Sequence, residues 1–158
     1  MIHDTDRKHL QRSVDLASEA LDSGNEPFGS VLVSSKGHVL FEDHNRIGGG
    51  DHTQHPEFAI ARWAANNMDA KDRATATVYT SGEHCPMCAA AHGWVGLGRI
   101  VYASSAAQMT EWLAELGVPT FRVRPLPISE VISGTIVEGP FEEFAMQVRA
   151  LHIRSHSG

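Results

Sequence analysis

The chain has 158 residues, of which 42% are hydrophobic and 20% are charged, and its formal net charge is −6 at pH 7. This length suits one domain with a sizeable core, and no stretch approaches the roughly 20 apolar residues that a membrane-spanning helix needs, so no membrane partner is expected. The acidic balance also disfavours a protein that binds nucleic acid by neutralising its phosphates. Because the charged start lacks the apolar core of a signal peptide, we expect a cytoplasmic location. We expect a single domain over residues 1–158, with a flexible tail from about residue 152.

Apolar periodicity and turn signals predict alternating helices and strands. The expected elements are, in order, a helix over 6–23, a hairpin within 28–45, a helix over 55–67, a strand over 75–81, a helix over 85–96, a strand over 99–104, a helix over 106–116, a strand over 120–125 and a helix over 141–154. Strands joined by helices of this length predict an α/β fold, a three-layer α/β/α sandwich around a five-stranded mixed sheet.

The only two cysteines, Cys85 and Cys88, open one of the predicted helices. Their spacing turns both sulfurs toward one side of the first turn, and Pro86 between them suits the first helical position. A disulfide between successive turns would close no useful loop. The C-x-x-C pair alone leaves open a metal site, a redox pair or two small buried side chains.

A second helix start supplies further candidate ligands, because His55-Pro56-Glu57 opens its helix in the same way. One imidazole and two thiolates make three zinc ligands and leave the fourth tetrahedral position to water, which is the arrangement of a catalytic site. Glu57, next to that histidine, can accept a proton from the water and deliver it to a leaving group. A carboxylate that only stabilises the first turn of a helix is the alternative. We therefore predict one Zn²⁺ per subunit, bound by His55, Cys85 and Cys88.

The combination of H-x-E with C-x-x-C resembles the signature of the zinc-dependent cytidine and deoxycytidylate deaminase superfamily. The resemblance covers the first helix, Phe28-Gly29, both metal motifs and the strand "RIVYAS". The sequence "CPMC" and the pair His44-Asn45 are most similar to the branch of guanine, cytosine and transfer-RNA adenosine deaminases. The resemblance implies the cytidine-deaminase-like fold, a homodimer, a proton-shuttling Glu57, an Asn45 that hydrogen-bonds the base and a Phe28 that stacks near it.

The chain departs from the family pattern at positions that bear on the substrate. Pro56, in the middle of H-x-E, has no backbone N–H to offer a substrate carbonyl. His84 stands where many members have proline, and we expect it to cap the loop or orient a neighbouring carbonyl. The "GFDD"-like end of purine-directed relatives is missing, so Glu111 or Glu115 becomes a candidate acidic group, with surface-helix glutamates as the alternative.

These residues together predict the hydrolytic deamination of a small amino-substituted ring such as guanine, cytosine, isocytosine or a triazine. Water adds to the ring carbon that bears the amine, Glu57 protonates the neighbouring ring nitrogen, and ammonia leaves. Ser81, on the strand leading to the first cysteine, is included among the substrate-binding residues. A nucleoside deaminase is the alternative, followed by a transfer-RNA adenosine deaminase, for which the charge is unfavourable, and by a zinc-stabilised module without turnover.

Large aromatic residues outside these motifs have simpler interpretations. Trp63, Trp94 and Trp112 lie on predicted helices and are assigned to core or subunit packing. Near the C-terminus, Phe141, Phe144 and Met146 are expected either to be buried against the domain or to cover the pocket as an apolar lid.

Overall fold

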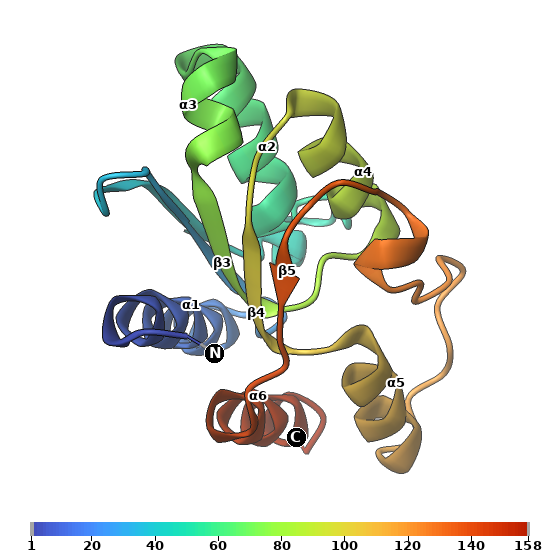
Figure 1. Cartoon of the computed structure of the whole chain (residues 1–158). Coiled ribbons are helices and arrows are strands. Elements are labelled where there is room, and N and C mark those ends of the chain that lie inside the picture. The colour runs from blue at the N-terminus through green and yellow to red at the C-terminus, as the bar shows by residue number, and fades with distance from the viewer. Residues whose placement is uncertain (1, 158) are drawn as a thin grey trace.

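The computed structural model describes residues 2–157, in which a mixed sheet lies between two layers of helices (Figure 1). The α-helices are α1 (Asp4–Asp22), α2 (Pro56–Asn67), α3 (Ala70–Thr75), α4 (Pro86–Val95), α5 (Ala106–Glu115) and α6 (Glu142–Ser155), and the short 3-10 turns are η1 (Ile47–Gly49) and η2 (Ile128–Glu130). The strands are β1 (Gly29–Val33), β2 (Val39–His44), β3 (Thr77–Gly82), β4 (Ile100–Ser104) and β5 (Val137–Glu138). Within residues 2–157, no helix combines the length and the apolar character needed to cross a membrane.

The sheet combines an antiparallel hairpin with parallel strands, as the sequence predicts. Its strand order is β2-β1-β3-β4-β5. β1 is antiparallel to both β2 and β3, whereas β3, β4 and β5 are parallel to one another. The predicted five-stranded mixed α/β sheet is therefore confirmed.

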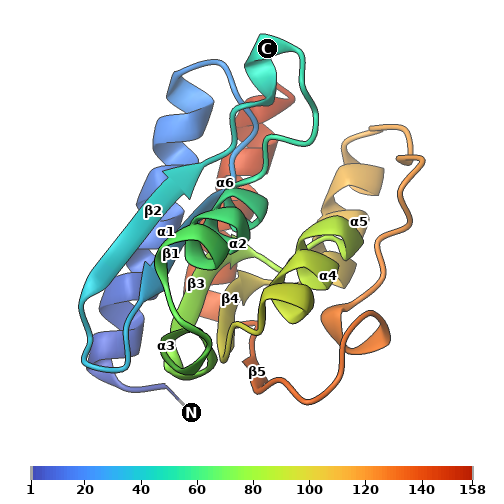
Figure 2. The same cartoon turned by 90° about the horizontal axis from the view of Figure 1, so that it is seen from above.

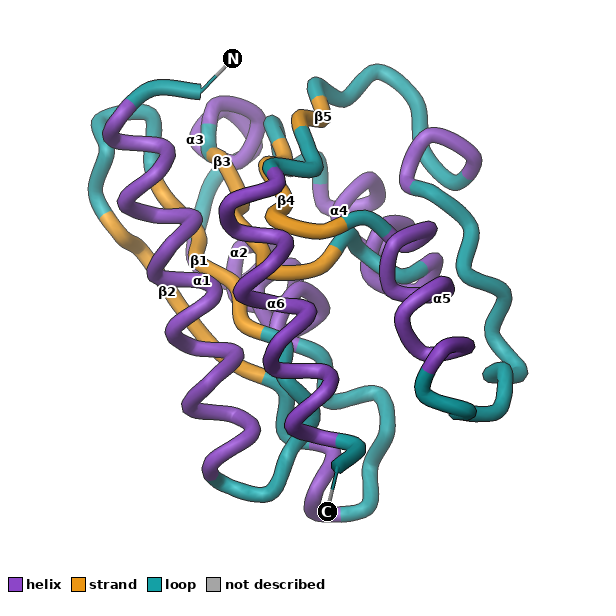
Figure 3. Tube along the Cα trace, turned by 90° about the horizontal axis from the view of Figure 1, so that it is seen from below, coloured by secondary structure: helices purple, strands orange, loops and turns teal. Residues whose placement is uncertain are grey.

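The helical layers enclose separate parts of the core. α1 and α6 lie side by side on one face of the sheet, while α2, α3 and α4 lie on the other (Figures 1 and 3). Leu10, Val101, Trp112 and Phe144 belong to the cluster on the α1 and α6 face, and Leu32, Ile60 and Val78 form part of the second cluster beneath α2. Burial on both faces explains why β1 and β4 consist mainly of apolar and small residues.

The fifth strand does not lie where the sequence predicts it. Residues 120–125 form an irregular segment, and Phe121 and Val123 are 56% and 58% exposed. Alternation of apolar and charged residues predicts a strand only where one face is buried, and neither face of this segment is. The position beside β4 belongs to β5, where the Glu138 carboxylate accepts a hydrogen bond from Arg99 Nε at 2.6 Å. The prediction of a strand over 120–125 is therefore wrong.

One helix was not predicted from the sequence, and the end of the chain differs from the predicted flexible tail. The sequence interpretation missed α3, a short helix whose N-cap Asp69 accepts a hydrogen bond from the Asp72 backbone N–H at 2.8 Å. The last helix, predicted over 141–154, runs over Glu142–Ser155, so residues 152–155 form its final turn and not part of a tail. His152 in that turn is buried.

Candidate active site

Three metal-ligand side chains meet where two helices begin (Figure 2 shows α2 beside α4). His55 is the N-cap residue of α2, Cys85 is the N-cap residue of α4, and Cys88 lies in the first turn of α4. His55 Nδ1 is 3.5 Å from each of the two sulfurs, and the three ligand atoms all lie within 4.8 Å of one another. Neither cysteine is in a disulfide. The structure thus brings the three predicted ligands together in a group positioned to bind one metal ion.

The charges of this group suit a divalent cation. A hydrogen bond with Cys88 and another with His55 lower the pKa of Cys85 to about 4, despite the opposing effect of burial. The Cys85 hydrogen bond in turn raises the pKa of His55 to about 9. A thiolate is therefore available in the metal-free protein, and a metal ion would replace the imidazolium proton. One imidazole and two sulfurs form a donor set typical of zinc.

Glu57 is a buried carboxyl group in the first turn of α2. Its Oε1 accepts a hydrogen bond from Ser30 Oγ at 3.0 Å, and that hydroxyl lies 2.8 Å from Thr80 Oγ1. Burial, assisted by the negative charge of Cys85, raises the pKa of Glu57 to about 7. A carboxyl group with such a pKa can both take up and release a proton near neutral pH.

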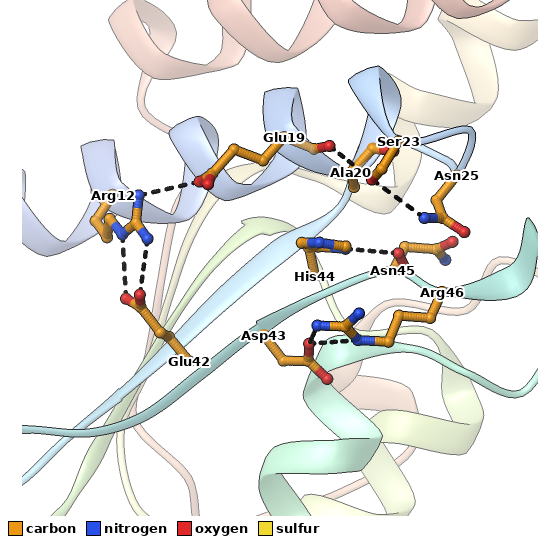
Figure 4. A network of polar contacts seen from close by, with 10 residues as sticks. All are labelled: Arg12, Glu19, Ala20, Ser23, Asn25, Glu42, Asp43, His44, Asn45 and Arg46. Atoms are coloured by element: carbon orange, nitrogen blue, oxygen red, sulfur yellow. Dashed lines mark hydrogen bonds and ion pairs between the residues drawn. The ribbon is translucent and has the colours of Figure 1, made fainter.

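Asn45 is anchored through its own oxygen at the end of β2. Its Oδ1 accepts hydrogen bonds from the backbone N–H groups of Glu26, at 3.3 Å, and Ile47, at 3.1 Å. Figure 4 shows Asn45 with His44, whose Nδ1 lies 2.8 Å from the Asn45 carbonyl oxygen. The Asn45 Nδ2 group has no hydrogen-bond partner among residues 2–157. The assigned amide orientation therefore keeps a fixed donor available to a ligand.

Phe28 contacts both Asn45 and Gly82, which precedes the loop that leads to Cys85. Its carbonyl oxygen accepts the Asn45 backbone N–H at 2.9 Å. Its half-buried ring lies against Gly82, where an added Cβ would approach the ring to 3.3 Å. A glycine at position 82 thus allows an aromatic ring to lie beside the loop that leads to Cys85.

The sequence matches the model of the cytidine and deoxycytidylate deaminase zinc-binding region over residues 3–104, a span that includes both metal motifs. The chain belongs to this family. As a member of it, the deaminase uses zinc, and its His-Cys-Cys group is positioned to hold that ion.

Two curated relatives and a solved structure illustrate the similarity of the deaminase to known proteins. A probable cytosine deaminase from Schizosaccharomyces pombe is 28% identical over 144 residues, which are 90% of this chain and 88% of the relative. A guanine deaminase from Bacillus subtilis is 34% identical over 113 residues, 70% of each protein. The structure of a guanine deaminase from Nitrosomonas europaea matches with a TM-score of 0.71 at 16% identity, over 100% of this chain and 87% of that one. At that identity the structural match shows the shared fold.

Other residues assigned to the substrate have different surroundings in the deaminase. Pro56 is buried at the first position of α2. Ser81 is buried, and its hydroxyl accepts the Gly29 backbone N–H at 3.1 Å, so it joins β3 to β1. Glu111 and Glu115 lie on the exposed side of α5, and Glu115 forms an ion pair with Arg149 at 3.5 Å. The structure brings neither of these glutamates into contact with the ligand group.

Sequence reasoning missed the groups that surround the metal loop. The Glu83 carboxylate accepts the backbone N–H groups of Ala106, at 2.9 Å, and Ile128, at 2.8 Å, and so anchors this loop. His84, expected to cap the loop or orient a carbonyl, instead packs edge-on against His92 with ring centroids 5.4 Å apart. Its buried ring nitrogens have no hydrogen-bond partner among residues 2–157. The sequence interpretation also missed the Ser30 and Thr80 hydroxyls. For Ser30 a signal was available: residues two positions apart on a strand point to the same face, and Ser30 stands two positions after Phe28.

Proposed function

We propose that this deaminase hydrolyses the exocyclic amine of a small free nucleobase or related ring, such as guanine, cytosine, isocytosine or a triazine. The observation that carries the proposal is the buried, hydroxyl-bonded Glu57 beside an open set of three metal ligands. A structural zinc site is normally closed by four protein ligands and has no use for such a carboxyl group. The names of the two curated relatives, a probable cytosine deaminase and a guanine deaminase, support a nucleobase substrate.

The protein's own residues account for the proton movements. Zinc, when bound, makes a water molecule acidic enough to give up a proton near neutral pH. Glu57 takes that proton and delivers it to the ring nitrogen next to the carbon under attack. A second transfer moves the proton of the added hydroxyl to the amine, so the carbonyl forms as ammonia departs. One water and one amine are thus converted into one carbonyl and one ammonia. The Ser30 hydroxyl holds the carboxylate at Oε1 during these transfers.

The polar groups around the proposed pocket suit a ring with an acceptor near Asn45. The fixed Nδ2 of Asn45 donates to a ring nitrogen or carbonyl, and Phe28 packs near the ring. At position 56 proline contributes no N–H, so a carbonyl that relies on a donor there would lose it. We assign these roles within a single domain spanning residues 1–158. A reducing compartment such as the cytoplasm suits the site, because both thiols must stay unpaired to bind a metal.

We also propose that the deaminase is a homodimer that pairs through α2 and α4. Trp94 on α4 is 90% exposed. A neighbouring depression of about 380 Å³ is lined by Phe58, Ala61 and Arg62 of α2 and by Ala91 and Trp94 of α4. A large aromatic side chain on one subunit can fill the depression on the other, and the reverse, across a two-fold axis.

Light scattering tests this pairing. Trp94→Glu should give a monomer, whereas the control Ile136→Glu, at a site 69% exposed, should leave the mass of the dimer unchanged. A monomeric wild type would refute the pairing.

Ammonia release tests the catalytic proposal. The zinc-loaded protein is assayed with free rings, with their nucleosides and with transfer RNA, and Glu57→Ala serves as the blank. Turnover of a free ring above the blank, with its nucleoside inert and zinc retained in the variant, is the expected result. Faster turnover of a nucleoside or of transfer RNA would favour those alternatives. Equal rates for wild type and Glu57→Ala on every substrate would leave a zinc-stabilised module as the better description.

A further inference from the structure

The last turn of α6 reaches the same end of the sheet as Asn45 and Phe28. The Arg154 guanidinium donates a hydrogen bond to the Asp22 carboxylate at 2.8 Å, which joins the end of α6 to the end of α1. Ser155 lines a depression of about 360 Å³ together with Asn25, Glu26 and Ile47. The backbone N–H groups of Glu26 and Ile47 are the ones that hold the Asn45 oxygen. The C-terminal helix therefore borders the segments that position the proposed substrate donor.

One polar side chain of α6 faces this region. The His152 ring meets the Phe28 ring nearly edge to face, with centroids 5.4 Å apart and planes at 67°. The Trp112 ring also lies near the His152 ring, with centroids 6.2 Å apart and planes at 44°. Phe28 in turn contacts Gly82 and the Asn45 backbone. His152 and Phe28 therefore form one continuous aromatic wall from α6 to Gly82, where the loop that leads to Cys85 begins.

The imidazole of His152 has unused hydrogen-bonding capacity. It is only 3% exposed, and neither ring nitrogen has a hydrogen-bond partner among residues 2–157. The His84 nitrogens are sealed from solvent, but those of His152 are not, so they border space that a water or ligand atom can enter. Burial lowers the pKa of His152 to about 4. At neutral pH the ring therefore offers one N–H donor and one nitrogen acceptor.

We propose that His152 determines ring specificity by hydrogen-bonding an edge of the bound ring that faces away from the metal group. This inference rests on the proposed function, because it assumes that a planar amino-substituted ring occupies the site. A group that is both donor and acceptor discriminates between rings whose edges differ in carbonyl, amine and N–H positions, since a mismatched edge leaves a buried group unpaired. The predicted apolar lid has no part in this arrangement: Phe144 is buried in the core and Met146 is 44% exposed.

The test compares His152→Phe with the matched control His156→Phe at an exposed histidine one turn further on. Phenylalanine keeps a ring against Phe28 but removes both nitrogens. For the best ring of the ammonia assay, we expect His152→Phe to raise KM about 10-fold, as for the loss of one hydrogen bond, while kcat changes much less. The ratio of the kcat/KM values for rings with different edges should also move closer to one. Both variants should match the wild type in zinc content and thermal midpoint. The kinetics of His156→Phe should match the wild type as well.

Several results would overturn the inference. KM values and ring preferences unchanged by His152→Phe would do so, as would a loss of activity that follows a loss of zinc or of folded protein. If the wild type turns over no ring, the proposed function fails separately. In that event calorimetry of the same rings with Glu57→Ala, with and without His152→Phe, decides the question. Binding that weakens about 10-fold supports the role of His152, and unchanged or undetectable binding rejects it.

Discussion

Ser30 Oγ lies 3.0 Å from Glu57 Oε1 and 2.8 Å from Thr80 Oγ1, so a strand hydroxyl supports the buried carboxyl group of the proposed proton shuttle. This hydrogen bond favours the charged form of Glu57 and lowers its pKa, against the larger upward effect of burial. Ser30→Ala removes the bond, so the pKa of Glu57 should rise further. The acid limb of the pH profile of kcat/KM should then move to higher pH. A hydrogen bond to a charged group contributes about 1.5–3 kcal/mol, so we expect a fall of at least about 10-fold in kcat/KM at neutral pH.

A second buried serine provides the control for this measurement. Ser13 donates only to the Leu10 carbonyl oxygen within α1, at 2.6 Å, and lies outside the site. Ser13→Ala should leave the pH profile in place, although it changes the same side chain in an equally buried position. If Ser30→Ala retained the wild-type acid limb, the hydroxyl would have no influence on the Glu57 proton.

Metal uptake should depend on pH, because thiols and imidazolium must lose protons before they bind zinc. We expect the metal-free protein to bind about one Zn²⁺ and to release protons as it does so, with the affinity falling as the pH falls. Cys88→Ser should lower the zinc content well below one per chain. The exposed His52, three positions before His55, supplies the control, and His52→Ala should keep the full content. Elemental analysis and chelator competition measure both quantities; equal zinc retention by the two variants would argue against the His-Cys-Cys group.

The sequence predicted the elements that carry the metal ligands better than it predicted those around them. Pro56 and Pro86 each mark a first helical position. These local signals predicted the starts of both helices correctly, and His55 and Cys85 are their N-cap residues. The strand over 120–125 failed because alternation says nothing about whether a neighbouring strand is present. β5 has only two residues, too few to show an alternation of apolar and polar side chains, and its position depends on pairing with β4.

The substrate-side residues show the same limit. Local signals indicated Phe28 and Asn45, but nothing in the sequence connects His152 with Phe28, because their contact depends on how α6 crosses the sheet. Single-sequence patterns report the burial of one element, whereas a pocket wall is made by the packing of several. Ser81 shows the opposite error. Its position close to the metal motif in the sequence suggested contact with the substrate, but its hydroxyl accepts a hydrogen bond from the backbone of β1.

The stability of the fold at acid pH should depend on the buried carboxylate of Asp6, whose partners Tyr79 and Arg99 are distant in the sequence. Asp6 on α1 accepts hydrogen bonds from Tyr79 Oη at 2.6 Å and from Arg99 Nη1 at 2.9 Å. Burial alone would raise the pKa of Asp6, but these bonds, together with the His3 backbone N–H, hold it well below its ordinary value. A carboxylate with a depressed pKa stabilises the fold above its unfolded-state pKa of about 4, and that stability is lost as the pH falls through the folded-state value.

Asp6→Asn should therefore lower the free energy of unfolding by about 2–4 kcal/mol at pH 7, because Arg99 loses a buried partner, and the deficit should shrink below about pH 4. Urea unfolding at a series of pH values measures this. Asp22→Asn removes an ion pair whose carboxylate side chain is 69% exposed, so it should change stability little at any pH. A deficit for Asp6→Asn that stayed constant down to pH 2 would show that packing, not charge, is what the residue contributes.

The contact between α1 and β1 should tolerate no side chain at Gly29. A Cβ there would lie 2.4 Å from the Ser13 carbonyl oxygen and 2.5 Å from Leu16 Cβ, both on α1. Gly29→Ala must push α1 away from the sheet next to Phe28, and overpacking of this kind costs about 1–3 kcal/mol. We expect a thermal midpoint lower by several degrees and weaker ring binding, because Phe28 follows the displaced strand. Gly49, with nothing within 4 Å of an added Cβ, is the matched control, and Gly49→Ala should leave both measurements unchanged. A stable Gly29→Ala protein with normal ring binding would mean that α1 can shift without disturbing the Phe28 wall.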